Sequence, residues 1–440
     1  MRELVVKNGR VVTPQGILEA TLLVTDGKIE ALLDASMATD CIEAEAVIDA
    51  AGKHVVPGMV DAHVHIGEPG KSEKEEISTG TRSAAVGGIT TLMIMPNSIP
   101  PVNSAESLRE RVDLFMGKAH VDFAMLGGAG AELPENIVPQ AEAGVVGYKS
   151  YIRDYNPNRK GLICKDAGDV YITLKEAAKA ERRVGYHAED ASLIRVLTEE
   201  LRDAGRTSFA DFHPSRPEST EIISTLILLE VALLTGAPLH LVHMSSPRAI
   251  ELARQWRDWG ADVSVETCPH YLLFSDEDTA KWGPYAQVAP PLRSPEAVEM
   301  MWELVNDGLI DIIATDHAPG LSSEKEDGKN DIFKSGGGLP ALETTLPTLF
   351  DKVRVGRITM ERLVEMTAEM PARLFHLYPR KGALVPGADA DFNIVNLDET
   401  VTFDIRKMYT KGWDAARIFD GLTVHGKIEQ TFLRGQLEAL

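Results

Sequence analysis

Short apolar runs alternate through the middle of the chain with longer stretches that have helical spacing. Eight apolar runs have the length of strands, at Met59–His65, Ile89–Met95, Val121–Leu126, Val145–Tyr151, Arg183–His187, Leu239–His243, Asp262–Thr267 and Asp311–Asp316. Helical patterns lie between them, for example at Ser104–Gly117, Leu174–Ala180, Glu221–Leu234, Pro247–Trp259 and Glu296–Asn306. This alternation is typical of βα units that build a parallel sheet.

The eight predicted strands fit an α/β fold, a (β/α)8 barrel of the TIM type. They occupy residues 59–316, close to the roughly 250 residues that such a barrel takes. In this fold the side chains at the C-terminal ends of the strands form the active site. We therefore expect functional residues at the ends of the apolar runs. The irregular stretch Leu321–Gly338 follows the last run, and we expect it to be an active-site loop.

Both ends of the chain look different from the middle. Residues 1–55 hold strand-like runs at Leu4–Lys7, Val11–Thr13, Ala20–Thr25 and Lys28–Leu32, which are broken by the turn signals Asn8-Gly9, Pro14-Gln15-Gly16 and Asp26-Gly27. Residues 379–440 repeat this character, with runs at Phe392–Asn396 and Val424–Leu433. These patterns predict that residues 1–55 and 379–440 pair into one small β-sandwich domain, beside a barrel of residues 56–378.

Charge and composition narrow the function classes. The chain has 45 Lys and Arg against 66 Asp and Glu, a net charge of −21 that is spread along its length. Such a surface repels phosphate backbones and anionic lipids, so we expect neither a nucleic-acid nor a membrane partner. The 3 cysteines are an odd number, which argues against a disulfide framework. Neither a signal-peptide pattern nor an apolar run of about 18 residues is present, and we expect a cytoplasmic protein.

Histidines gather at the predicted strand ends. His63 and His65 are two apart on one strand, so their side chains point to one face. His187, His243 and Asp316 end three further strands. These are ligand types that suit a borderline divalent ion, and together they indicate a metal site. His240 has odd spacing from His243, which predicts that it faces the helices and is structural.

Lys149 lies near the end of a fifth predicted strand, Val145–Tyr151, and allows two interpretations. An ammonium group repels metal ions, so one interpretation is a salt bridge at the barrel mouth. The other is a lysine that has taken up carbon dioxide, because the resulting carbamate could bridge two metals about 3.5–4 Å apart. The residue types alone favour the salt bridge.

The sequence resembles the cyclic-amide branch of the amidohydrolase superfamily, which includes dihydroorotases, allantoinases and hydantoinases. The motifs that carry the resemblance are GMVDAHVH from Gly58, Glu68-Pro69-Gly70, AAVGGITT from Ala84, Met95-Pro96-Asn97, AGVVGYKSY around Lys149, YHAED, LVHMSS, VETCPHYLLF, APPLR and ATDHAPG. The resemblance covers nearly the whole chain. The resemblance also implies the small β domain built from both termini.

The resemblance implies a binuclear metal centre. His63, His65, Lys149 and Asp316 would hold one ion, and Lys149, His187 and His243 would hold the other. The family usually uses zinc, with manganese, cobalt or iron as substitutes, and its lysine carries carbon dioxide as a carbamate. Asp316 would carry the proton from the attacking water to the departing ring nitrogen. The family is often dimeric or tetrameric, so we expect a homo-oligomer.

The ring that is opened is less defined by the motifs. Dihydroorotases carry the motif H-x-H-x-R, and its arginine binds the substrate carboxylate. In this sequence Gly67 stands at the position of that arginine. This absence favours a neutral ring such as allantoin or a hydantoin, whereas ATDHAP looks more like a dihydroorotase, which stays the alternative. Asn97 and His317 match substrate-contact positions of the family. Tyr155 and Tyr151 are two candidates for a tyrosine that assists the oxyanion.

Three rival classes remain. A non-catalytic scaffold with the same fold is one, but such relatives usually lack a ligand and all six ligand positions are filled here. A phosphotriesterase-like hydrolase would share H-x-H and the lysine, although the other motifs speak against it. A metal-dependent deaminase would have no need for Lys149. Cys268 lies in VETCPH, and we interpret it as structural, because the metal site already supplies a base to activate a nucleophile.

Overall fold

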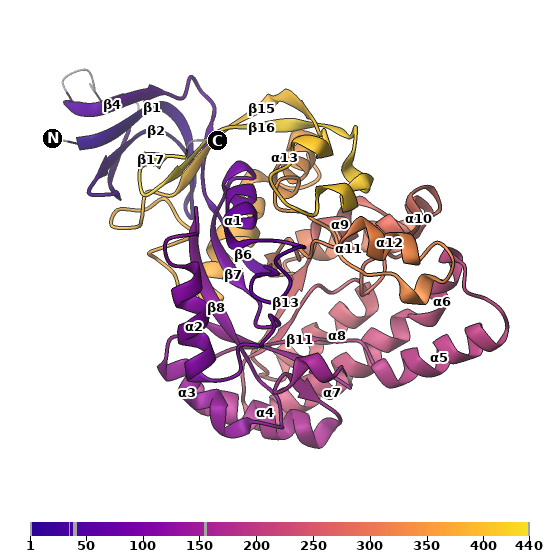
Figure 1. Cartoon of the computed structure of the whole chain (residues 1–440). Coiled ribbons are helices and arrows are strands. Elements are labelled where there is room, and N and C mark those ends of the chain that lie inside the picture. Colours follow the sequence, from indigo (N-terminus) through magenta and orange to yellow (C-terminus); the bar gives the residue numbers. More distant parts are fainter. Residues whose placement is uncertain (1, 35, 38–41, 154–155, 439–440) are drawn as a thin grey trace.

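The larger part of the molecule is a barrel of parallel strands surrounded by helices (Figure 1). The computed structural model describes residues 2–34, 36–37, 42–153 and 156–438. The barrel strands are β6 Met59–Val64, β7 Ile89–Ile94, β8 Asp122–Gly128, β9 Gly147–Ile152, β11 Val184–His187, β12 Leu239–Leu241, β13 Val263–Thr267 and β14 Ile312–Ile313, and the two-residue β10 Ile163–Cys164 pairs with β9. Each of the eight predicted strands is present, so the barrel prediction is confirmed.

The helices cover the outside of this sheet. Their bounds are α1 Ile77–Val86, α2 Ala105–Phe115, α3 Ile137–Glu142, α4 Ala167–Ala180, α5 Ala191–Asp203, α6 Phe212–Ser215, α7 Glu218–Thr235, α8 Pro247–Asp258, α9 Pro269–Leu273, α10 Asp276–Trp282, α11 Pro295–Asn306, α12 Ser322–Asp327, α13 Thr345–Arg354, α14 Met360–Val364 and α15 Met370–Leu374. Several begin at a capping side chain. Ser246 accepts from Ala249 N before α8, and Ser294 accepts from Ala297 N before α11. Each also has proline at its first turn, where a missing N–H costs nothing.

The first and last barrel strands meet through a side chain. Strands β6 and β14 are the two ends of the hydrogen-bonded order. The Asp61 carboxylate on β6 accepts from the backbone N of Thr315 at 3.0 Å and from its hydroxyl at 2.6 Å. The backbone N of His65 also donates to the carbonyl of His317 at 2.9 Å. These contacts hold the barrel together at its seam.

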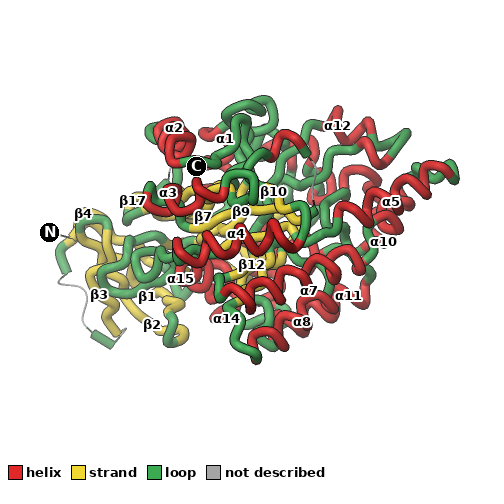
Figure 2. The backbone as a smooth tube through the Cα atoms, turned by 90° about the horizontal axis from the view of Figure 1, so that it is seen from below, coloured by secondary structure: helices red, strands yellow, loops and turns green. Residues whose placement is uncertain are grey.

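The two ends of the chain form one further sheet, which lies beside the barrel (Figures 1 and 2). Its strands are β1 Arg2–Thr13, β2 Gly16–Thr25, β3 Lys28–Asp34, β4 Ala44–Asp49, β5 His54–Pro57, β15 Phe392–Thr402, β16 Thr423–Leu433 and β17 Gln436–Leu437. Strand β5 pairs with β1 on one side and with β15 on the other. The prediction that the termini build one small β domain is confirmed.

Two local predictions differ from the structure. Asn8-Gly9 was expected to be a turn between two strands, but β1 runs through it with a bulge, where Asn8 adopts φ 56° and the register with β2 shifts. The strand continues through Asn8-Gly9 because the extra residue of a bulge bends a strand without ending it. The expected loop Leu321–Gly338 contains the short helix α12. Within the described residues, no helix is both long enough and apolar enough to cross a membrane.

A buried cation connects the barrel to the C-terminal part of the sheet. The Lys381 ammonium lies 2.5 Å from the Asp391 carboxylate and 3.0 Å from that of Asp389, and it also pairs with Asp122 at the start of β8. Lys381 is 6% exposed. The ammonium fills the centre of an aspartate cluster that would otherwise resemble a cation site, so we interpret the cluster as structural.

Candidate metal centre

The six predicted ligands converge on one cavity at the C-terminal ends of the barrel strands. His63 and His65 come from the end of β6, Lys149 from β9 and His187 from the end of β11, while His243 and Asp316 follow β12 and β14. All six line a cavity of about 340 Å³. This is the end of the barrel where βα folds place their active sites, and the volume is that of a small-molecule site.

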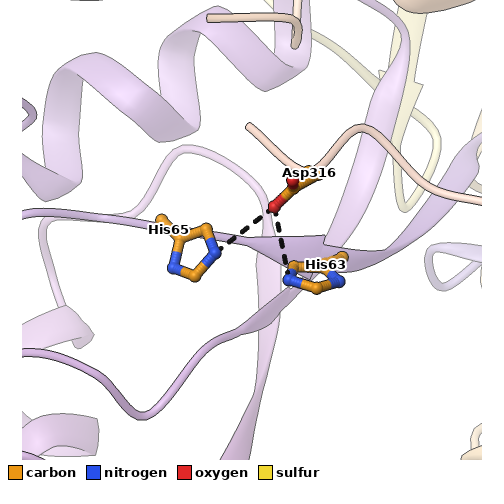
Figure 3. A group of neighbouring side chains, drawn as sticks. All are labelled: His63, His65 and Asp316. Carbon is orange, nitrogen blue, oxygen red and sulfur yellow. Dashed lines mark ion pairs between the residues drawn. The ribbon is translucent and has the colours of Figure 1, made fainter. Parts of the chain in front are cut away.

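His63, His65 and Asp316 form a ready three-ligand set (Figure 3). One Asp316 oxygen lies 3.3 Å from His63 Nε2 and 3.4 Å from His65 Nε2. Two ligand atoms that are each about 2.1 Å from a tetrahedral zinc ion lie about 3.4 Å from one another. The spacing therefore fits one divalent ion between the three side chains. Asp316 adopts φ 45°, an uncommon conformation for a non-glycine residue that is often found at functional sites.

His187 and His243 form the second half of the centre. His187 Nδ1 lies 3.1 Å from His243 Nε2, and the His243 ring centroid is 5.2 Å from that of His63. A second ion held by this pair would therefore be a neighbour of the first. His243 reaches this position because the chain leaves β12 at Leu241 and adopts φ 40° at His243.

The direction predicted for His240 is wrong. Its ring nitrogens lie 2.8 Å from the Ser264 hydroxyl and 3.2 Å from Glu266, and it is 1% exposed inside the barrel. Counting alternate faces from His240 to His243 fails because the strand ends between them, so the left-handed turn returns His243 to the inner side. His240 keeps the structural role that the sequence suggested.

Lys149 is a buried amine without a hydrogen-bond partner among the described residues. It is 1% exposed, and its Nζ lies 5.1 Å from the centre of the Tyr151 ring. Burial, opposed in part by the charges of Asp316 and Glu266, lowers the pKa of Lys149 to about 7. A salt bridge would have supplied a partner for the ammonium. The geometry instead suits an amine that reacts with carbon dioxide, because only the neutral form is a nucleophile.

Three of the candidate ligand histidines have a hydrogen-bond acceptor beside the ring nitrogen that does not face the metal site. His63 Nδ1 lies 2.8 Å from Glu266, His65 Nδ1 lies 2.9 Å from Asn97, and His187 Nε2 lies 2.9 Å from Glu189. With that nitrogen protonated, the lone pair of the other nitrogen points into the metal site. Such partners fix the tautomer and the ring orientation of metal-binding histidines.

Glu266 has the largest share in this orientation. Besides His63, it accepts from His240 and from the backbone N of His243 at 3.0 Å. Burial raises its pKa, but the charge of His63 and the hydrogen bonds from both histidines outweigh this and leave the pKa well below the ordinary value. Sequence reasoning missed Glu266 and Glu189. Both are acidic residues at predicted strand ends, in VET and YHAED, and that position was the available signal.

The predicted substrate contacts divide into three groups. Asn97 and Tyr151 line the cavity. His317 is fully buried, its Nε2 lies 3.2 Å from Glu75, and its Nδ1 accepts from the backbone N of Ala341. Both of its ring nitrogens are thus occupied away from the cavity lining, so its substrate contact stays a prediction that this geometry does not favour. Tyr155 lies outside the described residues.

Comparison with known proteins shows the family to which the chain belongs. Residues 54–437 match the model of the amidohydrolase family. The chain is 37% identical to an L-hydantoinase of Paenarthrobacter aurescens, over 100% of this chain and 95% of that protein. It is 35% identical to an allantoinase of Solibacter usitatus, over 99% of this chain and 93% of that protein. This protein belongs to the amidohydrolase family.

Solved structures share the fold over the full length. An L-hydantoinase (dihydropyrimidinase) from Arthrobacter aurescens superimposes with a TM-score of 0.94 at 36% identity and covers 99% of this chain and 96% of its own. A dihydropyrimidinase from Brevibacillus agri gives a TM-score of 0.90 at 27% identity, with 99% and 95% covered. The resemblance predicted from the motifs is confirmed.

Replacing Glu266 with glutamine tests whether this side chain orients the centre. Glu266→Gln keeps the shape but loses the charge and one acceptor, so we expect the zinc affinity to fall about 10- to 100-fold. Competition with a chromophoric chelator measures this affinity directly. Glu200→Gln, an exposed change on α5, is the control and should leave the affinity unchanged. Wild-type zinc affinity in Glu266→Gln would show that Glu266 has only a packing role.

Proposed function

We propose that this protein is a hydrolase that opens a cyclic amide or ureide ring of the allantoin or hydantoin type at a binuclear metal centre. The observation that carries the proposal is the convergence in one cavity of two histidine pairs, Asp316 and a buried lysine that has no hydrogen-bond partner among the described residues. The similarity to relatives named hydantoinase and allantoinase, which extends over nearly the whole chain, supports it. A dihydroorotase stays the alternative for the ring. A non-catalytic scaffold is disfavoured, because the six ligand side chains are present and oriented.

The donor set indicates which metals would be bound. Four imidazoles, one carboxylate and one carbamate suit zinc, with manganese, cobalt or iron as alternatives. We infer that His63, His65 and Asp316 hold one ion, His187 and His243 hold the other, and a carbamate on Lys149 bridges them. When bound, the metal pair would supply a water molecule that is acidic at neutral pH and a Lewis acid for the ring carbonyl.

Asp316 would move the proton in this reaction. Burial raises its pKa, but the charge of His63 and the hydrogen bond to His65 more than offset this and lower it to about 2. The group is therefore a carboxylate at neutral pH and can accept a proton from the attacking water. Because an amide nitrogen is a poor leaving group, return of this proton to the ring nitrogen completes the bond cleavage. The cavity-lining Asn97 and Tyr151 would contact the ring.

A second copy of the chain is the partner that the surface favours. Helix α7 packs against both α4 and α5. Large apolar side chains are exposed on these three helices, at Tyr171, Ile172, Val196, Ile223, Leu226 and Leu234. Exposed apolar side chains that gather in one region are typical of protein interfaces. We propose a dimer or tetramer that covers them, in a reducing cytoplasm where the buried Cys164 and Cys268 stay free thiols.

The association is predicted to depend on this apolar surface. Sedimentation velocity should give a dimer or tetramer for the wild type and a smaller species for Leu226→Glu, because a charge cannot be buried there without a partner. Leu437→Glu changes an exposed leucine of the terminal sheet and should leave the assembly intact. A wild-type monomer at micromolar concentration would exclude the oligomer.

A substrate panel tests the function. Hydantoin, allantoin, dihydrouracil and dihydroorotate are incubated with the zinc-loaded protein, and ring opening is followed by the appearance of the carbamoyl product. We expect turnover of at least one five-membered ureide ring, because the metal site would activate the ring carbonyl and Asp316 would return a proton to the ring nitrogen. Turnover of dihydroorotate alone would replace this assignment with the dihydroorotase alternative. The absence of turnover for every ring would refute a cyclic amidohydrolase.

Reconstitution with and without bicarbonate tests the role of Lys149. Carbon dioxide adds to the neutral amine, and with a pKa of about 7 the neutral fraction rises as the pH increases through 7. Zinc binding to the apoprotein should therefore be faster at pH 8 than at pH 6 and should require bicarbonate. Lys149→Ala should bind less zinc at every pH, whereas the exposed Lys334→Met should behave as the wild type. Two bound metals and full activity in Lys149→Ala would contradict the bridge.

A further inference from the structure

The mouth of the cavity is rich in positive charge. Lys71, Lys74 and Arg159 line it, and Asp316 is the one acidic side chain among the described lining residues. This local excess is opposite to the net charge of −21 of the whole chain. A concave surface of one charge sign concentrates its field inside the cavity, so the cavity favours negatively charged ligands even on an acidic protein.

The cations at the mouth differ in what holds them. The Lys74 ammonium lies 2.6 Å from the Glu324 carboxylate, which neutralises it. The Arg159 guanidinium lies 3.7 Å over the Tyr151 ring. The Lys71 side chain makes no hydrogen bond or ion pair that the described residues account for, although it is only partly exposed. Burial first, and then the charge of Lys74, lower the pKa of Lys71, whereas the charge of Glu324 opposes this in part. Because Glu324 is already paired with Lys74, the Lys71 ammonium has no ion pair of its own among the described residues.

The loop after β6 explains why the cation comes from position 71. The backbone N of Lys71 donates to the Gly67 carbonyl at 2.8 Å, which closes a tight turn. A Cβ atom on Gly67 would lie 2.2 Å from the Lys71 carbonyl oxygen, a distance that real atoms do not adopt. A side chain at position 67 is therefore excluded by the turn that brings Lys71 to the cavity.

We propose that Lys71 binds a carboxylate on the substituent of the ring, so that the substrate is an anionic cyclic ureide. This inference rests on the proposed ring-opening function and adds the charge of the substrate to it. A lysine offers three donors on a flexible stem, which suits a substituent that extends away from the reacting amide bond. Arg159 adds to the positive potential around the same point. A single available ammonium matches a singly charged carboxylate better than a doubly charged phosphate.

The matched pair 5-methylhydantoin and hydantoin-5-acetate differs by one carboxylate and isolates this contact. For the zinc-loaded wild type we expect kcat/KM to favour hydantoin-5-acetate, with the preference weakening as salt is raised. Lys71→Met keeps the length of the stem and removes the charge, so the preference should fall by about tenfold or more, mainly through KM. Lys71→Arg should retain it, and the exposed Lys334→Met should match the wild type.

The outcomes separate this inference from the function on which it rests. Opening of 5-methylhydantoin as efficiently as hydantoin-5-acetate, with the same ratio in Lys71→Met, would overturn the anion site while leaving the ring-opening function intact. If neither hydantoin is opened, the same variants are compared with the six-membered pair dihydrouracil and dihydroorotate. Lys71→Met is then expected to lose the preference for dihydroorotate to the same extent. Failure of all four rings, together with failure of allantoin in the substrate panel, would refute the function itself. Zinc content measured in each variant excludes loss of the metal as the cause.

Discussion

The contact between Asp61 and Thr315 is the constraint on which the rest of the site depends. The ligands of one proposed ion come from both sides of the barrel seam, His63 and His65 from β6 and Asp316 from the segment after β14. Asp61 lies two residues before His63, and Thr315 directly precedes Asp316. The hydrogen bonds that close the seam therefore also set the register between the ligands. A slip at this point would open the barrel and separate the carboxylate from its histidines.

This contact has an energetic cost that the surroundings offset. Asp61 is fully buried, and burial raises its pKa to about 7 even against the hydrogen bonds from Thr315. An unpaired buried carboxyl would be strongly destabilising, but here backbone and hydroxyl groups donate to both of its oxygens. The same logic applies to Glu266, which is surrounded by donors from His63, His240 and the backbone of His243. Buried acids thus hold the histidines that water would otherwise solvate.

The sequence was sufficient to predict the barrel and the convergence of the six candidate ligands on one cavity, because both are local signals. A buried parallel strand is a short apolar run, and each ligand sits at the end of one. Contacts that the chain makes after a strand has ended could not be predicted from these local patterns. The position of His243 beside His187 and the burial of His317 against Glu75 both depend on where the chain turns. These positions follow from the left-handed backbone conformation of His243 and Asp316. The residue types histidine and aspartate do not by themselves predict such a turn.

The charge of the substrate illustrates the same limit most clearly. The absence of an arginine at position 67 favours a neutral ring only if no other residue can supply a cation to that part of the cavity. In the folded chain the turn that requires glycine at position 67 is the turn that presents Lys71. The missing side chain and the added cation are therefore two consequences of one backbone geometry. A motif comparison detects only the missing side chain, whereas the loop conformation connects it with Lys71 and supports the proposal of an anionic ring.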